Sequence, residues 1–373
     1  MAVIGHSGRG DYGHGLDTVW LSLPETELVG VADADPAGLE RAKQRLKLSQ
    51  GFASYRELLK ATRPEVVAVC PRRPEQHHAM TMAAIEAGAK GIYVEKPYCR
   101  TPAEADEITA ACERRGVKLA VAHRNRYHPV LQTIDKLLEA GELGRLLEIR
   151  GRGKGDRRGG GEDLWVLGSH VLNLMHYFGG AARTCSARMY QDGRLVTAKD
   201  VRPGAEELGP LAGNELHARY EMEKGVVGYF DSIANDGARN FGFGLQLIGS
   251  QGVINIGCDR NPLAHFRRGN PFEPIPAPQP WEPISTAGIG KEEPNLELAR
   301  DISHHVTSAR DLLAAIAENR PPLCDHTQGA ATVEMICGVF ESHRQDGRAV
   351  PLPLKVRVNP LTLLAPGDNS KEA

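Results

Sequence analysis

The fold of this chain is decided by the stretch Gly91-Ile-Tyr-Val-Glu95-Lys96-Pro97-Tyr-Cys99. Its apolar run ends abruptly in a carboxylate, an ammonium group and a proline. Such a run is typical of a buried parallel strand, and ligands bind at the carboxyl ends of the strands in open α/β sheets. The proline ends the strand directly after Lys96. A surface Glu-Lys pair before a turn is the alternative interpretation, and the upstream sequence decides between the two.

A glycine-rich loop follows the first apolar run of the chain, residues 2–5. Gly8, Gly10 and Gly13 match the spacing G-x-G-x-x-G. Glycines in this pattern allow a tight turn and let the backbone approach a pyrophosphate at a helix N-terminus. A single match is a weak signal in a loop so rich in glycine, so a second element has to support it.

That second element is an acid at the end of the next apolar run, residues 28–32. Asp33 follows Gly13 by 20 residues (33 − 13), the distance expected of the acid that binds the adenosine ribose hydroxyls. An ordinary surface aspartate at a strand end is the alternative. Together with the glycines upstream, Asp33 predicts a dinucleotide site. No lysine or arginine directly follows Asp33 to bind a 2′-phosphate, so we expect NAD rather than NADP.

Strands and helices alternate up to residue 122, which predicts a doubly wound parallel sheet in an α/β domain. Further strands are expected at 66–70 and 118–122. Helices are expected at 36–48, 55–61, 77–87 and 101–116. The last helix begins with a capping box, in which Thr101 is the N-cap, Pro102 the first helical residue and Glu104 the third.

The sequence changes in character after a helix expected at residues 129–140. Short strands separated by turns are typical of an antiparallel sheet, and we expect them at 146–151, 182–190, 215–221, 226–232, 243–248 and 252–256. Residues 258–295 are rich in proline and glycine and are expected to cover the surface as an ordered loop. Residues 295–319 have the apolar spacing of one helix, and the tail, 366–373, is expected to be disordered.

Composition limits the possible functions. The chain has 373 residues, enough for two domains, and a formal net charge of −2. This balance gives no overall electrostatic reason to bind nucleic acid or an anionic membrane, and no stretch reaches the roughly 18 apolar residues of a membrane span. Met1 is followed at once by an apolar run and not by a basic segment, so no secretory signal peptide is expected. The seven cysteines are scattered without a C-x-x-C pair, so we expect free thiols in a reducing cytoplasm.

The order of these motifs resembles a known family. A glycine-rich turn, Asp33, a loop from Pro71 to His77, and Glu95-Lys96-Pro97 follow one another as in the Gfo/Idh/MocA oxidoreductases. The resemblance continues through residues 122–129, 141–145, 312–322 and 330–342. It implies an NAD(P)-dependent oxidoreductase with an amino-terminal Rossmann domain, residues 1–122, and a carboxyl-terminal α+β domain with an open, mostly antiparallel sheet, residues 123–365.

The resemblance and the chemistry of alcohol oxidation together suggest roles for the site residues. Oxidation moves a hydride to nicotinamide while the hydroxyl proton leaves. The resemblance implies that His170 acts as base or proton relay, which suits a side chain with an unperturbed pKa of about 6.5. The Lys96 ammonium group would stabilise the developing alkoxide, and Glu95 would orient Lys96 or the nicotinamide ribose. Pro71 and His77 would approach the cofactor, and the Lys96–Pro97 peptide bond is expected to be cis.

The segment around His170 departs from the family pattern. Family dehydrogenases commonly carry one aspartate four residues before this histidine and another three residues after it. Val166 and Asn173 stand at these positions here. A valine can neither hold a sugar hydroxyl nor tune the histidine. Asp163 is a candidate to replace the missing carboxylate, and Asn173 and His170 are candidate substrate ligands with Lys96.

Other polar residues allow two interpretations. Arg126 and Tyr127 are candidate substrate ligands at the junction of the predicted domains, and interdomain packing is the alternative. The basic, glycine-rich segment 150–158 is expected to be a solvated loop, with capture of a substrate carboxylate or phosphate as the alternative. His304 and His305 lack a pattern of partnering acids, so no metal site is expected.

The sequence therefore predicts an NAD-dependent oxidoreductase that acts on a secondary hydroxyl or keto group of a sugar, sugar acid or cyclitol, with Lys96 and His170 handling the proton. Two alternatives stay open. One is a redox-assisted glycoside lyase or hydrolase that recycles tightly bound NAD, and the other is a catalytically idle NAD-binding sensor. The resemblance also implies a homodimer or homotetramer formed through the carboxyl-terminal sheet.

Overall fold

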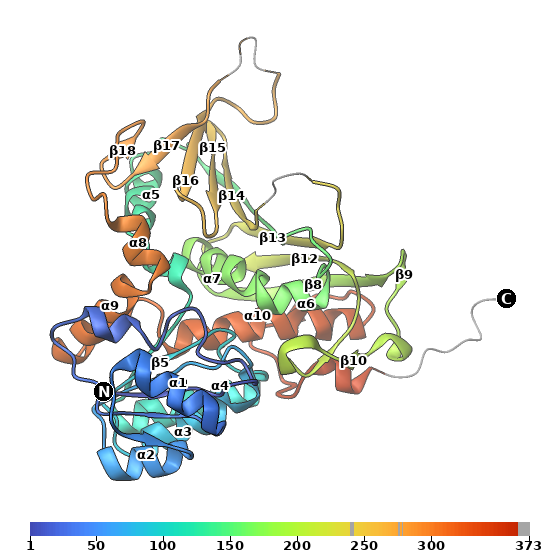
Figure 1. The fold of residues 1–373 in the computed structure, drawn as a ribbon. Coiled ribbons are helices and arrows are strands. Elements are labelled where there is room, and N and C mark those ends of the chain that lie inside the picture. Colours follow the sequence, from blue (N-terminus) through green and yellow to red (C-terminus); the bar gives the residue numbers. More distant parts are fainter. Residues whose placement is uncertain (239–241, 275–276, 278, 365–373) are drawn as a thin grey trace. The chain divides into compact units, whose positions relative to one another are not determined.

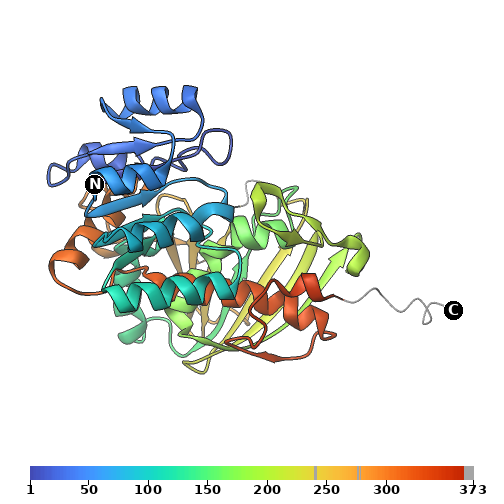
Figure 2. The same ribbon diagram turned by 90° about the horizontal axis from the view of Figure 1, so that it is seen from below.

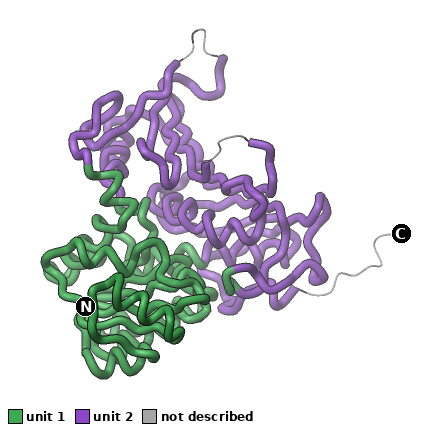
Figure 3. The backbone as a smooth tube through the Cα atoms, viewed as in Figure 1, with its two compact units in different colours: residues 1–127, 206–208, 297–333 green, residues 128–205, 209–296, 334–373 purple. Residues whose placement is uncertain are grey.

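The computed structural model describes residues 1–238, 242–274, 277 and 279–364. Contacts within the chain divide it into two compact units, neither of them continuous in sequence (Figure 3). Unit 1 contains Met1–Tyr127, Glu206–Leu208 and Glu297–Val333, and unit 2 contains His128–Ala205, Gly209–Leu296 and Glu334–Ala373. The predicted tail, residues 366–373, lies outside the described residues. Among the described residues, no helix is both long and apolar enough to cross a bilayer.

Unit 1 is built on six parallel strands, the blue to cyan part of Figures 1 and 2. They are β1 Ala2–Ile4, β2 Gly30–Ala32, β3 Gly51–Phe52, β4 Val66–Val69, β5 Gly91–Val94 and β6 Lys118–Val121. Their order in the sheet is β3-β2-β1-β4-β5-β6, the order of a Rossmann sheet, so the predicted doubly wound parallel sheet is confirmed. Because all strands run in one direction, the ends of β2 and β5 bring Asp33 and Glu95 to the same edge.

Helices of unit 1 follow the predicted alternation. They are α1 Pro36–Leu46, α2 Tyr55–Thr62, α3 His77–Glu86 and α4 Pro102–Arg115. At the start of α4 the Thr101 side chain accepts a hydrogen bond from the Glu104 N–H at 3.2 Å, as the capping box predicts. The Glu104 carboxylate accepts from the Arg100 N–H at 2.7 Å. In a capping box this carboxylate accepts from the N–H of the N-cap residue itself. Here it accepts from the residue before the N-cap.

The apolar core of unit 1 contains residues that lie far apart in the sequence. Trp20 from the amino-terminal segment and Tyr93 from β5 share this core with α9 Val306–Ala317, which contacts β5 and β6. Within residues 1–122, α3 contacts both α2 and α4. A helix that is distant in sequence therefore covers part of the sheet, and residues 297–333 group with unit 1.

The predicted single helix over residues 295–319 is wrong. Two helices, α8 Leu298–Ser303 and α9, are separated by a break at His304 and His305. His305 has a left-handed backbone with φ 62°, and its Nδ1 lies 2.7 Å from the hydroxyl of the buried Tyr93. The apolar spacing continues across the break, so a tertiary contact prevails over the local periodicity.

The glycine-rich loop does not lead into an α-helix. Between β1 and β2, all of which is described, the helical segment is the four-residue 3-10 helix Val19–Ser22. Pro24 follows closely and disfavours a helical conformation of the residue before it. The expectation of a helix N-terminus directly after the glycine-rich loop is therefore wrong, and contact of the loop with a pyrophosphate stays a prediction.

Unit 2 contains an eleven-stranded mixed sheet. Its order is β18-β17-β16-β15-β14-β7-β13-β12-β8-β19, and β9 pairs with β8. Among the described strands, β7 and β13 pair in parallel and the others antiparallel, which confirms the mostly antiparallel sheet. The strands expected from the sequence are β7 Leu146–Arg152, β8 Ala182–Gln191, β12 Glu215–Met222, β13 Val227–Ile233, β14 Gly244–Gly249 and β15 Gly252–Gly257.

Several shorter elements of unit 2 were not expected. The segment 258–295, predicted as a loop, contributes β16 Ala264–Arg268, β17 Glu282–Ser285 and β18 Gly288–Ile289 to the sheet. The other short strands are β9 Arg194–Leu195, β10 Arg202–Pro203, β11 Pro210–Leu211 and β19 Val350–Pro351.

The helices of unit 2 are α5 Val130–Glu139, α6 Gly161–Val166 and α7 Gly168–Gly179, together with α10 His326–Arg344, which begins in unit 1.

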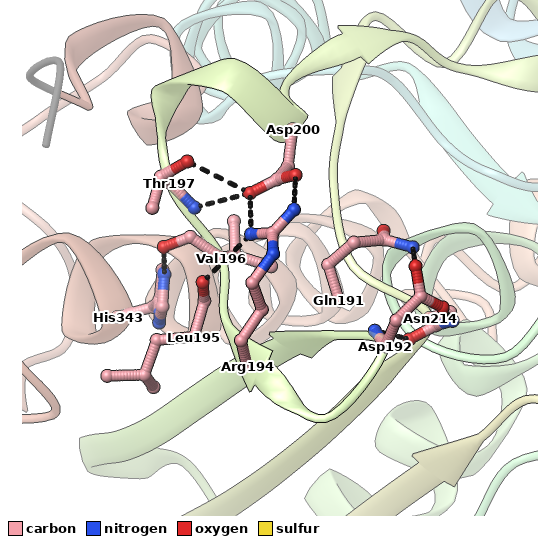
Figure 4. Close-up of polar contacts among 9 residues, drawn as sticks. All are labelled: Gln191, Asp192, Arg194, Leu195, Val196, Thr197, Asp200, Asn214 and His343. Atoms are coloured by element: carbon pink, nitrogen blue, oxygen red, sulfur yellow. Dashed lines mark hydrogen bonds and ion pairs between the residues drawn. The ribbon is translucent and has the colours of Figure 1, made fainter.

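α10 protects the edge of β8 between the parts that pair with β19 and β9. The Ser342 hydroxyl accepts a hydrogen bond from the Ala187 N–H at 2.8 Å. His343 accepts one at Nδ1 from the Met189 N–H at 3.2 Å, and its Nε2 lies 3.0 Å from the carbonyl oxygen of Val196 (Figure 4). Side chains of a helix therefore occupy the positions that a further strand would take.

We expect Ser342→Ala to lower the free energy of unfolding by about 1–3 kcal/mol, because it removes a buried partner of the Ala187 N–H and of the Arg348 carbonyl. Urea denaturation measures the change. Ser186→Ala is the control, since Ser186 lies on the same strand and is half-buried. A loss no larger than that of the control would contradict the edge-protecting role.

Candidate functional site

Glu95 and Lys96 follow β5 directly, and both are buried, with 1 % and 9 % exposure. His14, from the glycine-rich loop, lies with Nδ1 3.1 Å from Glu95 Oε1. Burial raises the pKa of Glu95, but the His14 contact and the Lys96 ammonium group lower it by more, so the carboxyl ionises more readily than usual. A buried carboxylate beside a buried lysine is therefore the charged centre of unit 1.

His123 belongs to the same centre. Burial and the charge of Lys96 lower the pKa of His123 to about 3, although Glu95 opposes the shift. The imidazole is therefore neutral at physiological pH, which avoids a second positive charge beside Lys96.

The segment after β5 has the geometry that the sequence predicted. The Lys96–Pro97 peptide bond is cis, which confirms the prediction. His77 is fully buried, with Nδ1 2.8 Å from the Pro97 carbonyl oxygen and Nε2 2.6 Å from that of Pro71. His77 therefore connects the loops after β4 and β5 from the protein interior. Cofactor contacts of His77 and Pro71 stay predictions.

Asp33 is surrounded by donors from its own chain. Its carboxylate accepts hydrogen bonds from the Ser7 N–H at 3.0 Å and the Ser7 hydroxyl at 2.7 Å. It also accepts from the Tyr12 hydroxyl at 2.8 Å and the Asp35 N–H at 3.0 Å. Burial raises the pKa of Asp33, and these donors lower it by more. Asp33 therefore has the charge of a ribose-binding acid, while the protein itself uses its acceptor positions.

The three motif glycines differ in their surroundings. All three have left-handed backbones, with φ of 79° at Gly8, 99° at Gly10 and 62° at Gly13. A Cβ at Gly8 would meet nothing within 4 Å, whereas one at Gly10 would lie 2.6 Å from the Arg72 backbone N. A Cβ at Gly13 would lie 2.8 Å from the Cys70 carbonyl oxygen. Gly8 therefore fits close approach of a pyrophosphate, and the other two let the loop pack on the chain after β4.

His170 and Asn173 lie on α7 in unit 2, with 5 % and 0 % exposure. The His170 ring centroid is 5.9 Å from that of Phe243. Val166 ends α6 and is buried, so the position where family dehydrogenases commonly have an aspartate is apolar here. His170 and Lys96 belong to different units, and the roles of His170 and Asn173 stay predictions.

Asp163 joins the basic loop to the sheet of unit 2. It is fully buried in α6 and accepts hydrogen bonds from the Ser232 hydroxyl at 2.6 Å and the Lys154 N–H at 3.1 Å. The Ser232 oxygen also accepts from the Gly160 N–H at 3.0 Å. Burial raises the pKa of Asp163, and its hydrogen bonds offset only part of that shift. This network supports a structural role, and its predicted contact with a substrate stays a prediction.

The basic segment 150–158 is neutralised in part by neighbouring acids. Arg158 donates two hydrogen bonds to Asp156, at 3.1 and 2.6 Å, and Arg152 pairs with Asp236 at 2.7 Å. Charges already paired in this way attract an anion less strongly. Residues 150–152 are the end of strand β7, so the predicted loop is wrong for them. For the rest of the segment the contacts favour a solvated loop over anion capture.

Tyr127 is buried in the 3-10 helix Arg124–Tyr127, which also contains Arg126. Its hydroxyl donates to the Val121 carbonyl oxygen at 3.1 Å and to that of Cys324 at 3.3 Å. These bonds support a packing role for Tyr127. Substrate binding by Tyr127 and Arg126 stays a prediction.

Four partners of these residues were missed in the sequence. His14 contacts Glu95, Ser7 and Tyr12 contact Asp33, and Ser232 contacts Asp163. The first three lie in or beside the G-x-G-x-x-G loop, so their position was an available signal. Ser232 lies 69 residues from Asp163 in sequence, and no local pattern joins them.

We expect Gly153→Ala to destabilise the protein by about 1–3 kcal/mol, because overpacking in a dense interior has costs of this size. The new Cβ would lie 1.8 Å from Asp163 Oδ2. Gly257→Ala is the matched control, since its Cβ would lie 3.0 Å from the flexible side chain of Arg260. Thermal unfolding compares the two, and equal melting temperatures would argue against the close approach of Asp163.

Glu95 should make stability depend on pH. Its pKa is lower in the folded protein than the ordinary value of 4.5, so its stabilising contribution is complete above pH 4.5 and is lost as the pH falls through the lower folded value. We expect Glu95→Gln to flatten the loss of stability between about pH 5 and pH 3. Urea denaturation across this range tests it, with the exposed Glu57→Gln as control. An unchanged slope would contradict an ionised Glu95.

The chain resembles known proteins in both halves of its length. Residues 1–123 match the family model GFO_IDH_MocA, described as an oxidoreductase family with an NAD-binding Rossmann fold. D-apiose dehydrogenase of Paraburkholderia graminis is 25 % identical over 80 % of this chain and 80 % of its own length. A putative UDP-kanosamine synthase oxidoreductase subunit of Amycolatopsis mediterranei is 29 % identical over 80 % of this chain and 85 % of its own length.

Solved structures show the same fold. Levoglucosan dehydrogenase in complex with NADH and L-sorbose has a TM-score of 0.73 at 20 % identity, covering 95 % of this chain and 98 % of that chain. The Rossmann sheet agrees with the family match over residues 1–123. This part of the chain matches the NAD-binding domain of the Gfo/Idh/MocA oxidoreductase family, and the chain as a whole shares the fold of the levoglucosan dehydrogenase structure.

Proposed function

We propose that this protein is an NAD-dependent dehydrogenase that interconverts a secondary hydroxyl and a keto group on a sugar, sugar acid or cyclitol. The observation that carries the proposal is the buried pair Glu95 and Lys96 at the end of β5. Asp33 ends β2 at the same edge of the parallel sheet. This edge offers an acid for an adenosine ribose and an ammonium group for a reacting oxygen.

Relatives support the substrate class. Two of them are named as dehydrogenases of D-apiose and of levoglucosan. A structure with the same fold holds NADH and L-sorbose. These compounds share secondary hydroxyl groups on a small carbon skeleton, which is the class proposed for this chain.

The residues at the edge of the sheet fit NAD better than NADP. Gly8 would let the main chain approach the pyrophosphate, and Asp33 would accept hydrogen bonds from the adenosine ribose. Asp35, three residues after the end of β2, adds a second carboxylate as the N-cap of α1. A 2′-phosphate would meet two negative charges here, which supports NAD. NAD supplies the hydride acceptor when it is bound.

Lys96 and His170 are proposed to act on the substrate oxygen. The Lys96 ammonium group donates a hydrogen bond to this oxygen and stabilises its negative charge as the proton leaves. His170 accepts that proton during oxidation and returns it during reduction. Glu95 fixes the position of the Lys96 charge, and His14 in turn orients Glu95.

A redox-assisted glycoside lyase or hydrolase is the second candidate, and Val166 is compatible with it. Val166 is buried and apolar where a family dehydrogenase commonly has an aspartate. Oxidation at a ring carbon acidifies the neighbouring C–H. When a base removes that proton, the C–H electron pair forms a C=C bond and the glycosidic substituent leaves with the electron pair of its own C–O bond. Without further addition this is a lyase reaction, and addition of water to the C=C bond makes it a hydrolysis. Return of the same hydride then restores the ring alcohol, and no cofactor is consumed.

The first experiment identifies the nucleotide that copurifies with the protein. The protein is denatured and released nucleotides are identified by mass spectrometry, and calorimetry then measures the affinity for NADH and NADPH. Reversible NADH binding with NADH formation from sugars or cyclitols supports the dehydrogenase. Stoichiometric retained NAD with glycoside cleavage supports the second candidate. Binding without turnover supports the sensor, and no dinucleotide binding contradicts all three.

We expect Lys96→Met to lower kcat by about 10²- to 10³-fold and His170→Ala by about 10²- to 10⁴-fold. Affinity for NADH should change little, because both side chains act on the substrate oxygen. Lys90→Met is the control, since Lys90 is exposed and pairs with Glu65 at the surface. A variant that kept most of the turnover would remove the corresponding residue from the mechanism.

A further inference from the structure

The acceptor positions of the Asp33 carboxylate are all used by donors of its own chain. Two main-chain N–H groups, those of Ser7 and Asp35, each lie 3.0 Å from Oδ1. Two hydroxyls, those of Ser7 and Tyr12, lie 2.7 and 2.8 Å from Oδ2. A carboxylate offers about four lone-pair positions, two on each oxygen. Any ribose hydroxyl that binds Asp33 must therefore replace one of these four donors.

Three of the four donors are fixed by the fold. The N–H of Asp35 belongs to the N-cap residue of α1, whose side chain accepts from the Gly38 N–H at 2.5 Å. Ser7 bonds Asp33 through both its main chain and its hydroxyl. The Ser7 hydroxyl also lies in a space left by Gly38, where an added Cβ would be 2.0 Å away. The two N–H donors leave Asp33 only if the backbone moves, and the Ser7 hydroxyl lies in that space beside Gly38.

Of the three residues that donate to Asp33, Tyr12 is the one that bonds it through its side chain alone. It lies in the glycine-rich loop between Gly10 and Gly13, both of which have left-handed backbones. Its ring rests on Gly5, where an added Cβ would lie 2.2 Å from the ring. The guanidinium carbon of Arg45 lies 4.5 Å from the ring centroid on the ring face. Packing and a cation–π contact therefore place the phenol, and its hydroxyl makes the bond to Asp33.

We propose that in the free protein the Tyr12 hydroxyl occupies the acceptor position on Asp33 that a ribose hydroxyl uses. It is displaced from Asp33 when a dinucleotide binds. This inference rests on the proposed function, because it names the group that a ribose hydroxyl replaces on Asp33. The exchange conserves the hydrogen bond, since one neutral O–H donor takes the place of another. A 2′-phosphate has no such proton to donate at neutral pH, so it cannot replace Tyr12 on equal terms.

Tyr12→Phe tests the proposal, because it keeps the ring and removes the hydroxyl. The free variant has an open position on Asp33, so NADH no longer has to break a bond to reach it. We expect the Kd for NADH to fall by about tenfold, which corresponds to about 1.4 kcal/mol. We also expect a lower melting temperature, because the bond to Asp33 is lost. Isothermal titration calorimetry and thermal unfolding measure the two effects.

Two further variants serve as controls. Tyr55→Phe removes a tyrosine hydroxyl from α2 in the same unit, and neither affinity nor stability should change appreciably. Asp33→Asn removes the charge of the acceptor and should weaken NADH binding. Lower stability combined with tighter binding distinguishes displacement from a purely structural role, which would lower stability without improving affinity.

The outcomes separate this inference from the proposed function. If the wild type binds NADH and Tyr12→Phe binds it equally well or more weakly, this inference is overturned and the proposed function stands. Tighter binding by Tyr12→Phe than by wild type supports it, including the case in which only the variant binds. Absence of NADH binding by both proteins would overturn the inference together with the proposed function.

Discussion

The candidate site depends on one constraint, the burial of the Glu95 charge inside unit 1. An ionised carboxylate in a protein interior is strongly unfavourable unless it is paired and hydrogen-bonded. Lys96 supplies the opposite charge, and His14 contacts Oε1 from the glycine-rich loop. Gly13 lets that loop pass close by, because a Cβ there would lie 2.8 Å from the Cys70 carbonyl oxygen. The loop, β5 and the charged pair therefore form one interdependent structure.

Three buried carboxyl groups show how surroundings set chemical character. Asp33 and Glu95 in unit 1 have lowered pKa values, because donors and a nearby cation outweigh burial. Asp163 in unit 2 has a raised pKa, because two donors compensate burial only in part. Unit 1 thus has two carboxyl groups at the edge of its sheet that ionise more readily than usual, which suits ribose hydroxyls and an ammonium group. Asp163 is more easily protonated, which suits a structural hydrogen-bond network.

Segments distant in sequence complete both sheets. α9 covers β5 and β6 in unit 1, and the break before it lets His305 lie against Tyr93. In unit 2, Ser342 and His343 of α10 occupy the open part of the β8 edge. A parallel sheet with an uncovered face and an antiparallel sheet with an open edge are both poorly stable in water. The carboxyl-terminal third of the chain therefore supplies what each sheet lacks.

The sequence alone determined the parallel sheet, its helices and the main strands of the second sheet, whereas the cis bond after Lys96 was expected from the family resemblance. These features depend on local signals, namely apolar runs, caps and the spacing of glycines and Asp33. It also indicated Glu95, Lys96, Asp33 and His170 as candidates. Tertiary structure decided the helix break at His305, the extra strands in 258–295, and the contacts of Tyr12 and Ser232. Those features depend on contacts between residues far apart in the chain, or on the fold of a loop without periodicity, so no local pattern records them.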